Sequence, residues 1–184
     1  MKKYLVFMII FLISVVALPA FSAGGNYINE LSGYALWNRS KKITVWVQPC
    51  EYSSTIYNAF REWMTAAGGC VKFVDARNKD DANITVSFAS DIGGLKAGVT
   101  HQRFIGNYMV KADIILRYKD FNNRKLSKNK MFAVAVHEIG HALGIVGHSS
   151  NRNDIMYPTT DIIGIHASDR DVNTIRAFYC SGKY

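Results

Sequence analysis

The stretch His137-Glu-Ile-Gly-His141-Ala-Leu-Gly144-Ile-Val-Gly-His148 is the most informative part of this 184-residue chain. On a helix, residues i and i+4 lie on one face, so His137 and His141 can present two imidazole nitrogens to one ion. Glu138 is rotated by about 100° from His137, so its carboxylate points beside such an ion rather than at it. Gly144 permits a left-handed turn that ends the helix, and His148 can then approach from another side.

This set of side chains favours zinc. Neutral imidazole is a zinc ligand, and three protein ligands leave the fourth tetrahedral position open for water, as in catalytic zinc sites. The residues therefore predict one Zn²⁺ ion held by His137, His141 and His148. Glu138 is expected to act as the general base that takes a proton from water. A calcium ion has no support in the sequence.

The flanking sequence contains the patterns of several strands and helices. Gly106-Asn107 suits a tight hairpin turn between two strands. Ser168, with Asp171 three residues later, is typical of a helix capping box, and Ser53-Ser54 can cap an earlier helix. Strands are expected at 43–47, 71–74, 84–88, 99–104 and 110–118, and helices from Ser53, from Ser127 to Leu143 and from Ser168. This order favours an α+β domain with a mostly parallel five-stranded sheet, one antiparallel edge strand and helices packed against it.

The N-terminus has the features of an export signal. Met1-Lys-Lys precedes an apolar run from Tyr4 to Leu18, and small residues stand at Ala20 and Ser22. The pattern predicts a signal peptide at 1–22, cleaved near Ser22. A short lead at 23–36 and one domain at 37–184, which contains the histidine motif, would follow it. A retained anchor is the alternative, but the run is short for a span of about 20 residues. We expect a secreted monomer, extracellular or periplasmic, with no membrane segment in the mature form.

The charge balance limits the partners. The formal net charge is +8, with basic residues scattered along the chain and densest at 117–130. That stretch could favour anionic surfaces, although a solvated loop is the simpler interpretation. No base-reading module is recognisable, so a nucleic-acid partner is not expected.

Residues 137–148, followed by Asp154-Ile-Met156-Tyr157-Pro158, resemble the metzincin zinc peptidases and most closely the matrixins. The resemblance implies a twisted five-stranded sheet, two long helices and a C-terminal subdomain with a methionine turn and a final helix. Met156 matches the methionine that supports the ligand base in that clan. The third histidine stands one residue later than in the family pattern, so Gly147 occupies its usual place. We assign the ligand to His148, and His166 is the rival.

The resemblance also implies an activity, that of a secreted zinc endopeptidase in which Glu138 assists a zinc-activated water. A protein or peptide substrate would lie extended along the edge strand at 99–104. Ala133, Tyr157 and Pro158 would line the pocket beside the metal. A cell-wall or small-peptide hydrolase is one alternative, and a non-catalytic secreted binding module stabilised by zinc is another. The intact Glu138 disfavours the second, because a purely structural site has no use for that carboxylate.

Three cysteines remain after the predicted signal peptide. Cys50 and Cys70 flank a helix of about four turns, which would separate them by about 20 Å and prevent a bridge. Cys70 and Cys180 resemble positions that astacins, another metzincin family, join between the second strand and the last helix. The resemblance therefore implies a Cys70–Cys180 disulfide and leaves Cys50 unpaired.

Overall fold

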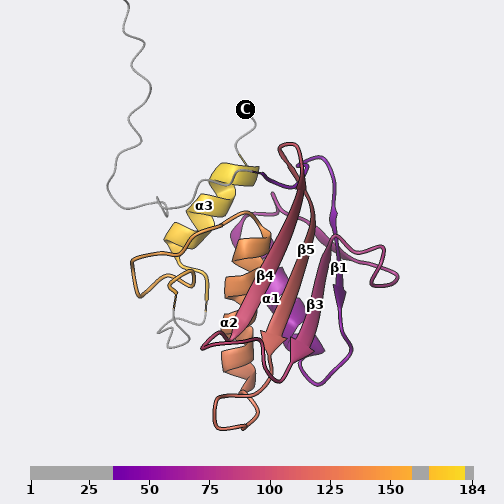
Figure 1. The fold of residues 1–184 in the computed structure, drawn as a ribbon. Coiled ribbons are helices and arrows are strands. Elements are labelled where there is room, and N and C mark those ends of the chain that lie inside the picture. The colour runs from indigo at the N-terminus through magenta and orange to yellow at the C-terminus, as the bar shows by residue number, and fades with distance from the viewer. Residues whose placement is uncertain (1–34, 159–165, 181–184) are drawn as a thin grey trace, which may run out of the picture.

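A five-stranded sheet forms one side of the domain (Figure 1). The computed structural model describes residues 35–158 and 166–180. The predicted signal peptide at 1–22 and most of the lead at 23–36 lie outside the described residues, as do 159–165 and 181–184. The strands are β1 (Ile43–Val47), β2 (Phe73–Asp75), β3 (Ile84–Ala89), β4 (Gly98–Ile105) and β5 (Tyr108–Arg117).

The strand order is β2-β1-β3-β5-β4. The pairs β1–β2, β1–β3 and β3–β5 are parallel, and β4 pairs antiparallel with β5 at the edge of the sheet. Gly106, with φ +57°, makes the turn of the β4–β5 hairpin. The predicted mostly parallel sheet with one antiparallel edge strand is therefore confirmed.

Two long helices pack against the same face of the sheet. They are α1 (Ser53–Ala66) and α2 (Lys128–Ala142), and the third helix, α3 (Asp169–Tyr179), lies beside α2 away from the sheet (Figure 1). This arrangement confirms the α+β class. Within the ranges described, no helix has both the length and the apolar character needed to cross a bilayer.

The helix starts follow the sequence signals at two of three places. Ser127 caps α2 by accepting a hydrogen bond from the Lys130 backbone N–H at 3.2 Å. Ser168 and Asp171 form the expected capping box of α3. The expected serine cap of α1 is wrong, because Tyr52 is its N-cap and makes no side-chain cap. The Ser53 hydroxyl lies 2.9 Å from the carbonyl oxygen of Cys50 and closes the preceding turn instead.

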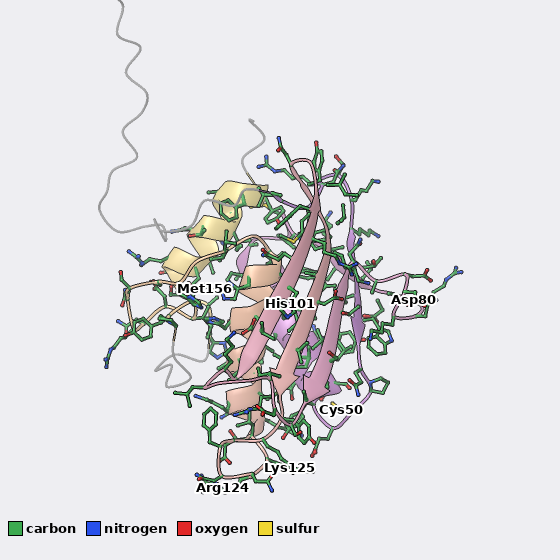
Figure 2. All side chains as sticks on the ribbon, viewed as in Figure 1. Cys50, Asp80, His101, Arg124, Lys125 and Met156 are labelled. Atoms are coloured by element: carbon green, nitrogen blue, oxygen red, sulfur yellow. A yellow bond between two sulfur atoms is a disulfide. The ribbon has the colours of Figure 1, made fainter. Side chains whose placement is uncertain are left out.

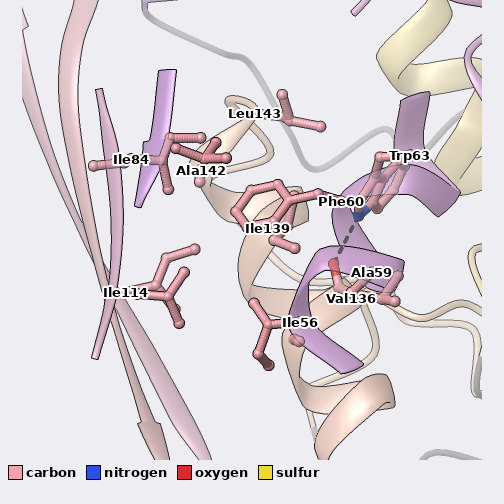
Figure 3. Close-up of a cluster of buried hydrophobic side chains, with 14 of the residues drawn as sticks. Ile56, Ala59, Phe60, Trp63, Ile84, Ile114, Val136, Ile139, Ala142 and Leu143 are labelled. Atoms are coloured by element: carbon pink, nitrogen blue, oxygen red, sulfur yellow. Dashed lines mark hydrogen bonds between the residues drawn. The ribbon is translucent and has the colours of Figure 1, made fainter. Parts of the chain in front are cut away.

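The core between α1, α2 and the sheet fixes the position of α2, the helix that carries His137 and His141. Trp63 of α1 is fully buried, and its indole N–H donates to the carbonyl of Val136 at 2.8 Å (Figure 3). Ile139 of α2 is also fully buried, as are Ile84 and, nearly, Ile114 on the sheet. Burial of such side chains stabilises the fold by about 1.5–3 kcal/mol each. Another face of α2 contacts β4.

One disulfide links two distant segments of the described residues. Cys70 and Cys180 are bonded, with their Cα atoms 5.2 Å apart, which is the pairing that the resemblance implied. The bond links the segment before β2 to the C-terminal end of α3. Cys50 is free and exposed.

Candidate metal centre

The three histidines of the opening motif meet at one point. His137 and His141 project from α2, and His148 comes from the loop that follows it. One ligating atom of each residue lies within 4.8 Å of the others. The chain reaches this point because Gly144, with φ +101°, turns it away from the helix axis. A Cβ at Gly144 would lie 2.7 Å from the Leu36 side chain, so the turn is closely packed as well as left-handed.

Backbone carbonyls orient two of the imidazole rings. Nδ1 of His137 lies 2.7 Å from the Ile155 oxygen, and Nδ1 of His141 lies 2.5 Å from the Ile145 oxygen. A carbonyl can only accept, so each Nδ1 carries the proton and each Nε2 offers a lone pair. The two Nε2 atoms are 3.1 Å apart. Two nitrogens bound tetrahedrally to one zinc ion would be about 3.3 Å apart, so the residues fit that metal.

The surroundings keep the histidines neutral. Burial, together with the neighbouring His141, lowers the pKa of His137 to about 3. Burial likewise lowers the pKa of His141 to about 4. The pKa of His148, the most exposed of the three, is also lowered because its ring is partly desolvated. Neutral imidazole is the protonation state that binds a metal.

Glu138 lies between the histidines and the edge strand. Glu138 is only 5% exposed, and its Oε2 accepts a hydrogen bond from the Thr100 hydroxyl at 2.6 Å. Burial raises the pKa of the Glu138 carboxyl to about 7, while the Thr100 hydrogen bond and the charge of Lys96 act in the opposite direction. A carboxyl group with a pKa near 7 is well suited to exchange protons at neutral pH.

The methionine turn passes directly beneath α2. Met156 is fully buried, and a Cβ on Gly140 would lie 2.4 Å from its sulfur. Figure 2 shows Met156 beside α2, on the side where α3 lies. The carbonyl that orients His137 belongs to the preceding residue, Ile155. The turn therefore packs against α2 and contacts the ring of His137 through its backbone.

Two buried carboxylates tie this turn to the start of α3. Asp171 accepts hydrogen bonds from the backbone N–H groups of Ile155 and Ser168, both at 2.8 Å. Asp154 accepts from the Ser168 hydroxyl at 2.7 Å and from Arg170 at 3.0 Å. Since the carbonyl of Ile155 also orients His137, the N-terminus of α3 is coupled to the histidine cluster through a single residue.

A cavity of about 670 Å³ opens beside the histidines. Pro158, one of the predicted pocket residues, lines it; the other two, Ala133 and Tyr157, are not among its lining residues. Ala133 is buried, and the next residue of α2, Val134, lines the cavity instead. The helix turns by about 100° per residue, so a shift of one position changes the face on which a side chain lies.

Several residues at this site were not predicted from the sequence. Gly98, Thr100 and Gln102 of β4 contact α2, and Val146 lines the cavity. Strand alternation could have put the three β4 residues on one face, but no pattern in the sequence set the register between β4 and α2. The rival ligand His166 lies elsewhere, because its Nδ1 is 2.7 Å from Glu62 and its ring packs on Phe132.

Comparison with known proteins gives one family. The family model described as Matrixin matches residues 31–180. Human matrix metalloproteinase-25 is 32% identical over 110 residues, which cover 54% of this chain and 19% of the relative. Rat macrophage metalloelastase is 31% identical over 111 residues, covering 55% and 24% respectively. Rat stromelysin-1 is 43% identical over 53 residues, covering 27% and 11%. The matched stretch thus spans less than a quarter of each of these relatives.

Proposed function

The chain belongs to the matrixin family, and on this premise we propose that it is a zinc-dependent endopeptidase. The single observation that carries the proposal is the convergence of three neutral imidazoles beside a buried carboxylate at the mouth of a cavity. We propose His137, His141 and His148 as the ligands of one zinc ion. Zinc, when bound, makes water a nucleophile at neutral pH and polarises the scissile carbonyl.

The chain's own residues would do the rest. Glu138 would take the proton of the attacking water on Oε1, since Oε2 is engaged by Thr100, and later return it to the leaving amine. The carbonyls of Ile155 and Ile145 would keep the two helical imidazoles in the tautomer that exposes Nε2. Met156 would hold the base of the site by packing against Gly140.

We propose that a protein or peptide substrate lies extended along β4, as expected for 99–104. In the described sheet β4 pairs only with β5. The backbone N–H and C=O groups on its other edge can therefore form hydrogen bonds with an extended substrate. Main-chain pairing of this kind gives affinity with little sequence selectivity. The cavity would take a substrate side chain, with Val134, Val146 and Pro158 supplying apolar walls.

The function is tested with the wild type beside Glu138→Ala. We expect both proteins to hold about one zinc ion per chain, because Glu138 is not a ligand, and the variant to lose at least about 100-fold in casein cleavage. Glu51→Ala is the matched control, since Glu51 is an exposed glutamate paired with Lys125. Equal turnover by Glu138→Ala and the wild type would refute the role of Glu138. Cleavage of peptidoglycan fragments but not casein would favour a cell-wall hydrolase.

We also propose export and release as a monomer after cleavage near Ser22. The support is the basic, apolar and small-residue pattern of residues 1–22. Intact-mass analysis of protein from the culture medium should give a chain that begins at Ala23. A chain that retains residues 1–22 and stays with the membrane would overturn this proposal.

A further inference from the structure

Three alternate residues of β4 lie against α2. A Cβ on Gly98 would lie 2.5 Å from Cγ of Glu138, so this glycine leaves the space that the glutamate side chain fills. The hydroxyl of Thr100 contacts the same residue, and the amide of Gln102 donates to the carbonyl of His141. The edge strand is therefore in direct contact with the proposed general base as well as with the helix that carries it.

The Thr100 hydroxyl is close enough to the Glu138 carboxylate to donate a hydrogen bond. Its Oγ1 is 2.6 Å from Oε2 of Glu138 and 3.1 Å from the Glu138 carbonyl oxygen. A hydroxyl has one hydrogen to donate, and 2.5–2.7 Å is typical of an O–H···O⁻ bond to a carboxylate. The Thr100 hydrogen is therefore directed mainly to Oε2.

No other side chain of the described residues hydrogen-bonds this carboxylate. Glu138 is 5% exposed, so water does not readily replace a lost donor, and Gly98 bounds the space on the strand side. The rotamer of Glu138 is thus set by one hydroxyl and by packing. With Oε2 engaged, Oε1 is the oxygen left to meet a reactant.

We propose that Thr100 is a positioning residue for Glu138: its hydroxyl fixes Oε2 and so aims Oε1 at the attacking water. This inference rests on the proposed peptidase function. In this role the Thr100 side chain acts through Glu138 and not on the reacting atoms. It acts by restricting the carboxylate to one orientation, the kind of pre-organisation on which proton transfer depends.

The test replaces the hydroxyl by a methyl group. Thr100→Val should lower kcat about tenfold with KM within about twofold and with unchanged zinc affinity, because a hydrogen bond to a charged group is lost and no ligand is altered. Thr100→Ser should restore most of kcat. Thr85→Val is the matched control, since the Thr85 hydroxyl also lies 2.6 Å from a carboxylate, that of Asp113 on the neighbouring strand. This control should lose stability without losing kcat.

A second measurement does not depend on catalysis. In the metal-free protein, Thr100→Val should lower Tm by about 4 °C in the wild-type background and by clearly less in the Glu138→Ala background, where no carboxylate is left unpaired. Equal shifts in the two backgrounds would overturn the hydrogen bond as the link.

The outcomes separate the two proposals. An active wild type with an equally active Thr100→Val overturns the role of Thr100 alone. A fall in kcat of similar size in Thr85→Val also overturns it, because the effect is then one of general stability. A wild type that cleaves no peptide overturns both the peptidase function and the inference built on it.

Discussion

His148 is the one proposed zinc ligand that lies outside α2. It comes from the loop after Gly144, and its ring stacks on His137 with centroids 5.2 Å apart. We expect His148→Ala to weaken zinc binding by at least about 100-fold, since loss even of an outer-shell partner costs 10–100-fold. Competition with a chelator measures this directly on the purified protein.

The matched control is the remaining candidate histidine. His166 is exposed and paired with Glu62, so His166→Ala should keep the wild-type zinc affinity. The metal-free His148→Ala variant should unfold at the same urea concentration as the wild type, because His148 is exposed. Loss of zinc binding in His166→Ala with retention in His148→Ala would reverse the assignment.

For individual residues, the sequence predicted those side chains of the site that lie close together in the chain. His137, His141 and Glu138 share one helix, so the helical period alone determines their relation. His148 required the turn at Gly144, which the glycine signalled. Thr100 and Gly98 were not found because they approach Glu138 from a strand about 40 residues away in the chain. Contacts between distant segments depend on packing that no short pattern encodes.

The close packing of the methionine turn on α2 requires a glycine at position 140. A Cβ on Gly140 would lie 2.4 Å from Sδ of Met156 and 3.2 Å from the Trp63 ring. We expect Gly140→Ala to destabilise the metal-free protein by about 1–3 kcal/mol through overpacking, and to weaken zinc binding by moving the turn. Urea unfolding and chelator competition give the two quantities.

A double variant shows whether Met156 is the neighbour responsible. Gly140→Ala and Met156→Ala together should cost less stability than the sum of the two single changes, because the smaller side chain makes room for the new methyl group. Additive effects would mean that Trp63, or the backbone, absorbs the strain instead.

Element boundaries were predictable where the polar signals are local. The capping box of α3 acts within one turn and formed as expected, and α2 begins directly after Ser127, where the helix start was predicted. The start of α1 differed because Ser53 hydrogen-bonds backward to Cys50 rather than forward into the helix. The sequence pattern could not distinguish these two directions, since a serine hydroxyl can serve either.

For the whole molecule, the class of sheet was easier to predict than its strand order. Strand–helix–strand order favours parallel neighbours, and Gly106-Asn107 indicated the antiparallel hairpin. The structure places β1 between β2 and β3, and β5 between β3 and β4, an order that depends on tertiary packing against α1 and α2 and has no local sequence signal. That packing involves residues such as Trp63 and Ile139, whose partners lie far away in sequence.

The Cys70–Cys180 bond is predicted to stabilise the molecule as a whole rather than the site. It closes a loop with a sequence separation of 110 residues, and loop-entropy arguments assign such a closure about 4–5 kcal/mol. The double variant Cys70→Ser/Cys180→Ser should therefore unfold at clearly lower urea than the wild type. Cys50 forms no disulfide and lies at the far end of the molecule from α3 (Figure 2). The control variant Cys50→Ser should therefore unfold at the same urea concentration as the wild type.

At temperatures where it is still folded, the variant Cys70→Ser/Cys180→Ser should have the same kcat as the wild type. The disulfide holds the C-terminal end of α3, whereas the histidine cluster is coupled to its N-terminal end through Asp171 and Ile155. Loss of the covalent bond therefore leaves the hydrogen bonds that orient His137. Casein cleavage measured at 10 °C separates the two effects. A variant that stays folded but loses zinc or activity would show that α3 transmits strain along its whole length to the metal centre.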